Sequence, residues 1–376
     1  MPGLYVHIPF CLRKCRYCDF VSFAPPYETG EYTEALKREI ELAARACHLR
    51  FDTVFIGGGT PSVLPHGAVS LLLHHINKNF SISSPTEITI ECNPGTVDAE
   101  KMSEYINSGV NRVSFGLQSS DDALLKRAGR IHDFSDFDRA FDLAQNAGFV
   151  NISADIMAGL PGQTQESYLA TLEELKKYGL KHISAYSLIL EPGTALLDDV
   201  MAGREILPDE AEVWAMQDAG KEMLENMGFL RYEISNYSIP GYECRHNVNY
   251  WKNKEYLGLG ISAHSALRDP SWTRRENARS MKRYLELINA GTLPVVKSTV
   301  IGQEEEMFEC VMLGLRMVSG IDLSEFEQRF CQSLVCIYKS ALDKLYKKGW
   351  IQEKDGNLML TEAGLDMQNA ALLEFM

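Results

Sequence analysis

Residues 4–18 read LYVHIPFCLRKCRYC, and residues 53–61 read TVFIGGGTP. The first stretch is a short β-rich run followed by three cysteines, and the second is a similar run followed by three glycines. Short runs of β-branched and aromatic residues that end in turn-forming residues predict β-strands. Both stretches therefore predict a strand that leads directly into a loop with functional potential.

Four further runs of this kind follow, and helical patterns separate all six. The expected strands are 4–8, 53–58, 87–92, 112–118, 151–157 and 182–190. The expected helices lie near 31–49, 67–79, 98–108, 135–147, 166–178 and 209–227. Strands that alternate with helices predict a parallel sheet and hence an α/β fold, which either curls toward a barrel or stays open.

Polar and glycine-rich residues follow the ends of these strands. In a parallel sheet the ligand site gathers at the carboxyl ends of the strands, so we expect these residues to lie near one another. They are Gly57-Gly58-Gly59-Thr60-Pro61, Glu91, Asn93-Pro94-Gly95, Gln118, Asp155 and Gly159-Leu160-Pro161-Gly162.

The charge and composition of the chain limit its partners and location. With 37 Lys and Arg against 51 Asp and Glu, the net charge is −14, which repels nucleic acid. No run approaches the roughly 18 apolar residues of a membrane helix, and the first ten residues do not resemble a signal peptide. We therefore expect a cytoplasmic protein with no nucleic-acid partner and no membrane anchor.

Cys11, Cys15 and Cys18 form the clearest candidate metal site. Their C-x3-C-x2-C spacing supplies three thiolates from one short loop, which can bind three irons of a 4Fe-4S cluster and leave the fourth without a protein ligand. A zinc site is the alternative, but zinc usually takes four closed ligands, and His7 is the only nearby fourth candidate. We interpret the other six cysteines as buried thiols.

The chain divides into three expected parts. Residues 1–228 contain the strand-helix units, 229–300 form an aromatic-rich extension, and 301–376 form a helical C-terminal domain. In the last part, helices near 304–318, 322–331 and 333–348 precede a hairpin at Asp355-Gly356 and a helix from 361. This order resembles a winged helix. Its 7 basic and 13 acidic residues favour a packing or partner-docking role over DNA binding.

These motifs together resemble the radical S-adenosylmethionine (SAM) superfamily, in its coproporphyrinogen III oxidase-like branch. The resemblance extends over roughly residues 4–270 and into the C-terminal domain. It implies a partial (β/α)6 barrel, a 4Fe-4S cluster and bound SAM. The matching motifs are YxHIPFCxxxCxYC (5–18), GGGTP (57–61), ECNPGT (91–96), SFGLQS (114–119), AGRIH (128–132) and DIMAGLPGQT (155–164).

The resemblance also implies which residues contact SAM. The backbone of Gly58 and Gly59 would approach the methionine part of the ligand, because neither has a Cβ atom, and the Thr60 hydroxyl would lie nearby. Glu91 and Asp155 would contact the ribose hydroxyls or the amino group. Arg130 would contact the ligand carboxylate, and Gln118 would offer its amide as a hydrogen-bonding partner. The residues implied by this match are Tyr5, Tyr17, Gly58, Gly59, Thr60, Glu91, Gln118, Arg130 and Asp155.

Two features indicate which members of the family the chain resembles most. The porphyrinogen-oxidising enzymes carry a further cysteine two residues after the third, where this chain has Phe20. Residues 246–251, HNVNYW, match the HNxxYW signature of HemW-type haem chaperones. His246 is a candidate haem ligand, since imidazole binds haem iron, although a histidine among aromatic residues also serves as a hydrogen-bonded packing residue.

The leading hypothesis is therefore a haem chaperone that binds haem and transfers it to an unidentified acceptor protein. The alternative is an enzyme, an oxygen-independent coproporphyrinogen III oxidase. A third reading, in which the cluster and fold are purely structural, predicts no reductive cleavage of SAM.

Overall fold

The computed structural model describes residues 2–376, and its centre is one twelve-stranded sheet. Six consecutive parallel strands form the middle of the sheet, in the order of the chain. The predicted α/β fold with a parallel sheet is confirmed. The six strands are β1 (Gly3–Ile8), β2 (Arg50–Gly58), β3 (Ser81–Cys92), β4 (Arg112–Gln118), β5 (Asn151–Ala158) and β6 (His182–Ser187).

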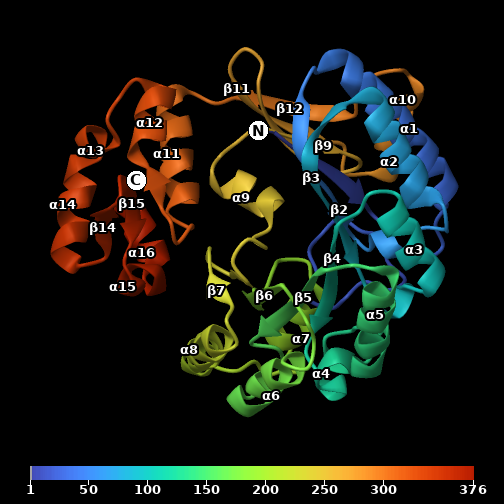
Figure 1. Ribbon diagram of the computed structural model, residues 1–376, viewed down its shortest axis with the longest axis horizontal. Helices are drawn as coiled ribbons and strands as arrows, with labels where there is room; N and C mark the ends of the chain where they lie inside the picture. Colours follow the sequence, from blue (N-terminus) through green and yellow to red (C-terminus); the bar gives the residue numbers. More distant parts are fainter. Residues whose placement is uncertain (1) are drawn as a thin grey trace.

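Helices cover the outer face of this sheet (Figure 1). Each predicted helix of this region is present within a few residues of its predicted bounds, because an amphipathic face is needed to cover the sheet. The short α4, which follows β4, and the short α7, which follows β6, were not predicted. The helices are α1 (Thr29–Ala46), α2 (Ala68–Asn79), α3 (Ala99–Asn107), α4 (Asp122–Arg127), α5 (Phe134–Ala147), α6 (Gln165–Leu175), α7 (Ala195–Met201) and α8 (Glu210–Asn226).

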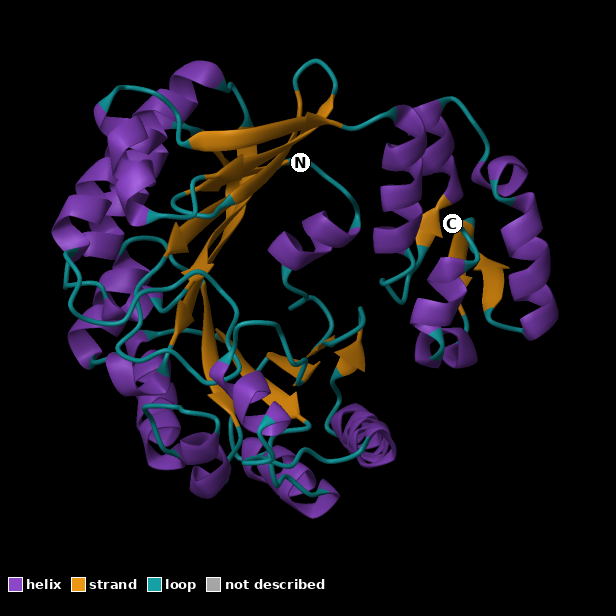
Figure 2. Ribbon diagram, turned by 180° about the vertical axis from the view of Figure 1, so that it is seen from behind, coloured by secondary structure: helices purple, strands orange, loops and turns teal. Residues whose placement is uncertain are grey.

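Residues after α8 extend the sheet at both edges. Strands β7 (Leu230–Arg231) and β8 (Asn236–Ser238) add to β6, while β9 (Tyr256–Leu259) pairs in parallel with β1. Beyond β9 come β10 (His264–Arg268), β11 (Trp272–Asn277) and β12 (Val295–Val300), all antiparallel, and α10 (Met281–Asn289) lies between the last two in sequence. The strands follow an arc whose inner side is left free of the outer helices (Figure 2).

Helix α9 (Arg245–Trp251), which carries the HNVNYW segment, lies on this inner side (Figure 1). The carboxylate of the buried Glu87 on β3 accepts hydrogen bonds of 3.0 Å from the backbone N–H groups of Arg245 and His246. These N–H groups have no partner within the helix, so a carboxylate at this position stabilises the helix start. The interaction fixes α9 against the sheet.

The C-terminal part has a hydrophobic core of its own, built from residues between Met307 and Phe375. Its helices and strands occur in the winged-helix order that was predicted. They are α11 (Gln303–Gly314), β13 (Ile321–Asp322), α12 (Leu323–Phe330), α13 (Leu334–Ile337), α14 (Lys339–Lys348), β14 (Ile351–Lys354), β15 (Asn357–Leu360), α15 (Glu362–Asp366) and α16 (Gln368–Leu373).

Ion pairs join this part to the sheet. Arg274 on β11 forms a 2.8 Å ion pair with Glu309 on α11. Glu306, which is 4% exposed, pairs with Arg268 on β10 and with Arg329 on α12. A buried carboxylate is stable only when such partners compensate its lost hydration, so these contacts hold α11 in place against β10 and β11.

Among residues 2–376, no helix has both the length and the apolar character required to cross a membrane.

Glu39 ties α1 to the extended edge of the sheet. Its side chain is 1% exposed and accepts hydrogen bonds from the Gly260 N–H (2.8 Å), the Asn277 amide (2.8 Å) and the Tyr284 hydroxyl (2.6 Å). Burial raises the pKa of Glu39 to about 7, and the three hydrogen bonds limit that rise.

We predict that Glu39→Ala lowers the free energy of unfolding by about 2–4 kcal/mol, because it leaves three buried donors without an acceptor. Urea unfolding of the purified protein measures the change. Glu34→Ala, on the same helix, removes only an exposed ion pair with Lys37 and should alter stability by less than about 0.5 kcal/mol. Equal effects of the two substitutions would contradict this account of Glu39.

Candidate cofactor site

The cysteine loop is closed at its base by backbone pairing. Immediately after β1, Phe10 forms an isolated parallel bridge with Phe23, and the Cys11 N–H donates to the Phe23 carbonyl at 3.0 Å. The Phe23 N–H donates to the Pro9 carbonyl at 2.7 Å. Residues 11–22 therefore form a loop whose two ends are held together at the carboxyl end of β1.

The far side of this loop is held by residues 127–130. The Arg16 N–H donates to the Ala128 carbonyl at 3.0 Å, and the Arg13 Nε donates to the Gly129 carbonyl at 3.1 Å. Arg130 in turn points back to the loop, and its guanidinium donates to the Cys15 sulfur at 3.3 Å and to the Gly116 carbonyl. The AGRIH motif thus supports the cysteine loop through its backbone and supplies a cation beside one thiol.

The glycine segment runs alongside the start of the cysteine loop. The Gly59 N–H donates to the Ile8 carbonyl at 2.8 Å, and the Thr60 N–H donates to the Phe10 carbonyl at 2.7 Å. A Cβ atom on Gly59 would lie 2.8 Å from the Phe10 carbonyl oxygen, so no other residue fits at this close approach. The Thr60 hydroxyl lies 3.5 Å from the Cys11 sulfur.

One cavity of about 470 Å³ collects most of the predicted site residues. It is bounded by the cysteine loop and by the carboxyl ends of the parallel strands. Cys11, Cys15 and Cys18 line it, together with Tyr17, Gly58, Gly59, Thr60, Glu91, Gln118, Arg130 and Asp155. The strand-end reasoning therefore located residues that the fold brings together.

Two carboxylates face this cavity from neighbouring regions of the sheet. Glu91 on β3 accepts a hydrogen bond from the Gly58 N–H at 3.1 Å, and Asp155 on β5 accepts one from the Ser114 hydroxyl at 3.2 Å. Burial, followed by the charge of Asp155, raises the pKa of Glu91 to about 7. Burial also raises the pKa of Asp155. Two poorly solvated carboxylates near each other favour a cationic or hydroxyl-rich ligand between them.

Gln118 closes the cavity in an unusual backbone conformation. Its φ is 76°, and the register of β4 against β5 shifts between Gly116 and Gln118. A non-glycine residue in this region is strained, and such strain concentrates at binding sites. The bulge turns the end of β4 and places the amide in the cavity lining.

Tyr5 lies outside this cavity and lines a second one on the inner face of the sheet. Its hydroxyl lies 3.0 Å from the His7 Nδ1, and its ring stacks on Phe55. Side chains alternate along a strand, so Tyr5 and His7 share a face of β1. Burial, followed by the charge of Glu91, raises the pKa of Tyr5. Glu91 lines the first cavity, so Tyr5 lies near that cavity without lining it.

His246 lines neither cavity. It is 1% exposed, its Nδ1 lies 2.8 Å from the Thr53 hydroxyl and its Nε2 lies 2.9 Å from the Tyr250 hydroxyl. Burial, together with the charge of Arg112, lowers the pKa of His246 to about 3, so the ring is neutral. With both nitrogens engaged, this arrangement corresponds to the packing role considered for His246 and leaves no nitrogen open to a haem iron.

Sequence reasoning missed part of the cavity lining. Residues 186–189, at the end of β6 and just beyond it, line the cavity, but the apolar run through residue 190 predicts strand throughout. The strand ends at Ser187. The Glu191-Pro192-Gly193 turn was the available signal, since it marks the carboxyl end of the sixth strand and hence a place in the site.

The donor set fits a cubane cluster and a charged ligand. Among residues 2–376, no three His, Cys, Asp or Glu side chains converge on a single metal position. In a cubane each thiolate binds a different iron, so the three sulfurs need no common point. The Arg130 Nε is also buried and has no hydrogen-bond partner in the described structure. Such a group calls for an acceptor, which a ligand carboxylate would supply.

Comparison with known proteins decides the family. A family model described as "Radical SAM superfamily" matches residues 5–175, and one described as "HemN C-terminal domain" matches residues 301–367. The protein called heme chaperone HemW in Bacillus subtilis (strain 168) is 35% identical over 379 residues, which cover 100% of this chain and 99% of that protein. This chain belongs to the HemW family.

Further comparisons agree with this membership. Heme chaperone HemW of Escherichia coli (strain K12) is 33% identical over 387 residues, covering 100% of this chain and 98% of that one. The structure of coproporphyrinogen III oxidase (HemN) from Escherichia coli, a radical SAM enzyme, superimposes with a TM-score of 0.86 at 21% identity, covering 100% of this chain and 90% of that one. This chain and that oxidase therefore share a fold, and the predicted resemblance is confirmed.

We predict that the affinity for SAM rises as the pH increases from about 6 to about 8, by several-fold and up to about tenfold. Glu91 loses its proton through a pKa of about 7, and its anionic form attracts the positive charge of the ligand. Equilibrium dialysis with labelled SAM on anaerobically reconstituted protein measures this change. Glu91→Gln should bind more weakly and lose this part of the pH dependence.

Glu100→Gln provides the control, because Glu100 is exposed on α3 and pairs only with His66. Its affinity profile should match that of the wild type. An unchanged profile in Glu91→Gln would contradict a role for this carboxylate in binding.

Proposed function

We propose that this chain is a haem chaperone, which binds haem and transfers it to an acceptor protein. The full-length match to proteins called heme chaperone HemW carries this proposal. The HNVNYW segment and Phe20, which replaces the fourth cysteine of the oxidising enzymes, support it. Haem is thus cargo and is neither consumed nor altered by the proposed activity.

In this proposal Cys11, Cys15 and Cys18 hold a 4Fe-4S cluster with one iron free for SAM. When bound and reduced, such a cluster would supply the electron for reductive cleavage of SAM. Gly58 and Gly59 line the same cavity as the three cysteines, and their backbone would contact the methionine part of the ligand without a side chain in between.

The remaining cavity residues orient the bound nucleoside. Glu91 and Asp155 receive the amino group or the ribose hydroxyls, and Arg130 receives the carboxylate. Gln118 offers its amide from the bulge. Tyr17 lines the same cavity, and Tyr5 supports the site from its edge. Together these residues would exclude water from the ligand and fix its direction.

The three parts of the chain take different tasks in this proposal. Residues 1–228 carry the cluster and SAM, and residues 229–300 supply the aromatic surroundings of the cargo. Residues 301–376 dock the acceptor protein, since their acidic balance repels nucleic acid and their core is independent of the sheet. Salt-bridged α11 connects this docking part to β10 and β11.

We predict that replacing Cys11, Cys15 and Cys18 together by alanine removes the cluster. Anaerobic iron and sulfide analysis should find about four of each per reconstituted wild-type chain and almost none in the triple variant. Cys47→Ala, which changes a thiol outside the cavity lining, should retain the wild-type content. A cluster that persists in the triple variant would overturn the assignment.

We predict that the reconstituted protein binds haem saturably at about one per chain. Absorbance titration in the Soret region measures the stoichiometry. An anaerobic assay with coproporphyrinogen III distinguishes the alternative: a chaperone yields no steady formation of protoporphyrinogen, whereas sustained turnover would show that the chain is an oxidase. Absence of saturable haem binding would reject the chaperone proposal directly.

A further inference from the structure

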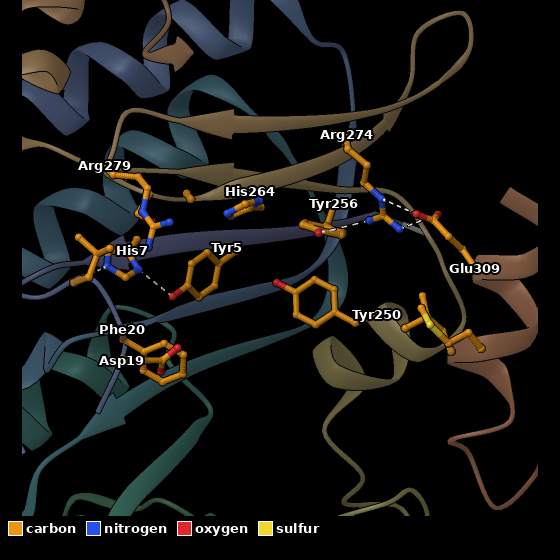
Figure 3. A pocket seen from close by; sticks show the side chains of 15 residues that line it. Tyr5, His7, Asp19, Phe20, Tyr250, Tyr256, His264, Arg274, Arg279 and Glu309 are labelled. Atoms are coloured by element: carbon orange, nitrogen blue, oxygen red, sulfur yellow. Dashed lines mark hydrogen bonds and ion pairs between the residues drawn. The ribbon is translucent and has the colours of Figure 1, made fainter. Parts of the chain in front are cut away.

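A second cavity of about 490 Å³ lies on the inner side of the sheet, between β1, β9–β11 and α11 (Figure 3). Its volume is in the range of cavities that bind cofactor-sized molecules. Aromatic and apolar side chains form much of its lining, with a few charged groups at the ends. The apolar and aromatic members are Tyr5, Phe20, Val21, Tyr250, Tyr256, Ala263, Met312 and Leu313.

The histidines around this cavity differ in their availability to a metal. His7 is 6% exposed, and its two nitrogens lie 3.0 Å from the Tyr5 hydroxyl and 2.9 Å from the Val21 carbonyl. His246 is engaged at both nitrogens, as described above. His264, the first residue of β10, is exposed and lines the cavity. Within residues 2–376 its imidazole has no hydrogen bond, so only His264 of these three offers a nitrogen to iron.

The charged side chains of the cavity also differ in whether they already have an ionic partner. Arg274 and Glu309 neutralise each other at one end through their 2.8 Å ion pair. Arg279, at the other end (Figure 3), is exposed and has no hydrogen bond or ion pair in the described part of the chain. Its guanidinium matches the geometry of a carboxylate. Asp19 is the remaining carboxylate in the lining and lies beside Phe20 in the sequence.

We propose that this second cavity is the haem site, with the His264 imidazole as axial ligand of the iron and Arg279 as the partner of a propionate. The inference rests on the proposed chaperone function and names its binding site. A planar macrocycle with an apolar body, a central metal and a carboxylate edge matches aromatic walls, one free imidazole and one free guanidinium.

The position of the cavity suits a cargo that must be released. Glu309, Met312 and Leu313 on α11 form one wall, so haem would contact both the sheet and the C-terminal part. Asp19 and Phe20 line this cavity and the cofactor cavity alike. Haem would therefore lie next to the cysteine loop, and the residues that follow Cys18 would separate it from the cofactor cavity.

The test compares haem binding by reconstituted full-length wild type, His264→Ala and His74→Ala. His74 is an exposed histidine on α2, outside the lining of either cavity, and its removal should change nothing. His264→Ala should bind haem at least tenfold more weakly and lose the signature of histidine ligation in resonance Raman or electron paramagnetic resonance spectra. Added imidazole should restore that signature. Circular dichroism confirms that each variant is folded.

Three further variants separate the roles of His264 and Arg279. His264→Met should retain binding but change the axial-ligand signature, because a thioether replaces the imidazole. Arg279→Ala should weaken binding severalfold and leave the ligation signature intact, while Arg279→Lys should recover part of the affinity.

The outcomes distinguish failure of the site from failure of the function. If wild type binds no haem, the chaperone proposal itself is rejected. If wild type binds haem and His264→Ala keeps the same affinity and the same histidine signature, the haem site lies elsewhere and this inference is overturned. Loss of the signature in His246→Gln but not in His264→Ala would assign the ligand to α9 and would equally overturn it.

Discussion

Two backbone hydrogen bonds between neighbouring parallel strands are the constraint on which the site depends. They run from the Gly59 and Thr60 N–H groups to the Ile8 and Phe10 carbonyls, over 2.8 and 2.7 Å. Because β1 and β2 are parallel, their carboxyl ends lie at the same edge of the sheet. The two hydrogen bonds continue the pairing of β1 with β2 beyond the ends of the strands. The glycine segment and the first cysteine are thereby held side by side before any ligand binds.

The sequence predicted this edge well because its signals are local. The spacing of the three cysteines and the run of glycines are each contained in a few residues, and strand-end geometry then brings them together. The resemblance placed Tyr5 among the SAM contacts, whereas its side chain lines the second cavity. Leu4, Val6 and Ile8 are fully buried on one face of β1, while Tyr5 and His7 point to the inner face, and only the completed sheet shows that this face lines a separate cavity.

The contacts of the aromatic segment could not be predicted from neighbouring residues in the sequence. Its composition marks it as an aromatic-rich extension, yet His246 contacts Thr53, 193 residues away, and Glu87, 159 residues away. No spacing within HNVNYW indicates these contacts. In this chain the HNVNYW segment seats α9 on the sheet, with Glu87 at the helix start and Thr53 against the imidazole.

The cysteine loop contributes to the lining of both cavities. Phe20 is 62% exposed, and it lines both cavities only two residues after Cys18. The backbone that sets the position of the Cys18 sulfur therefore also sets the position of this ring. A movement of this backbone would therefore also move the Phe20 ring in the walls of both cavities. Phe20 thus belongs both to the cysteine loop and to the boundary between the two cavities.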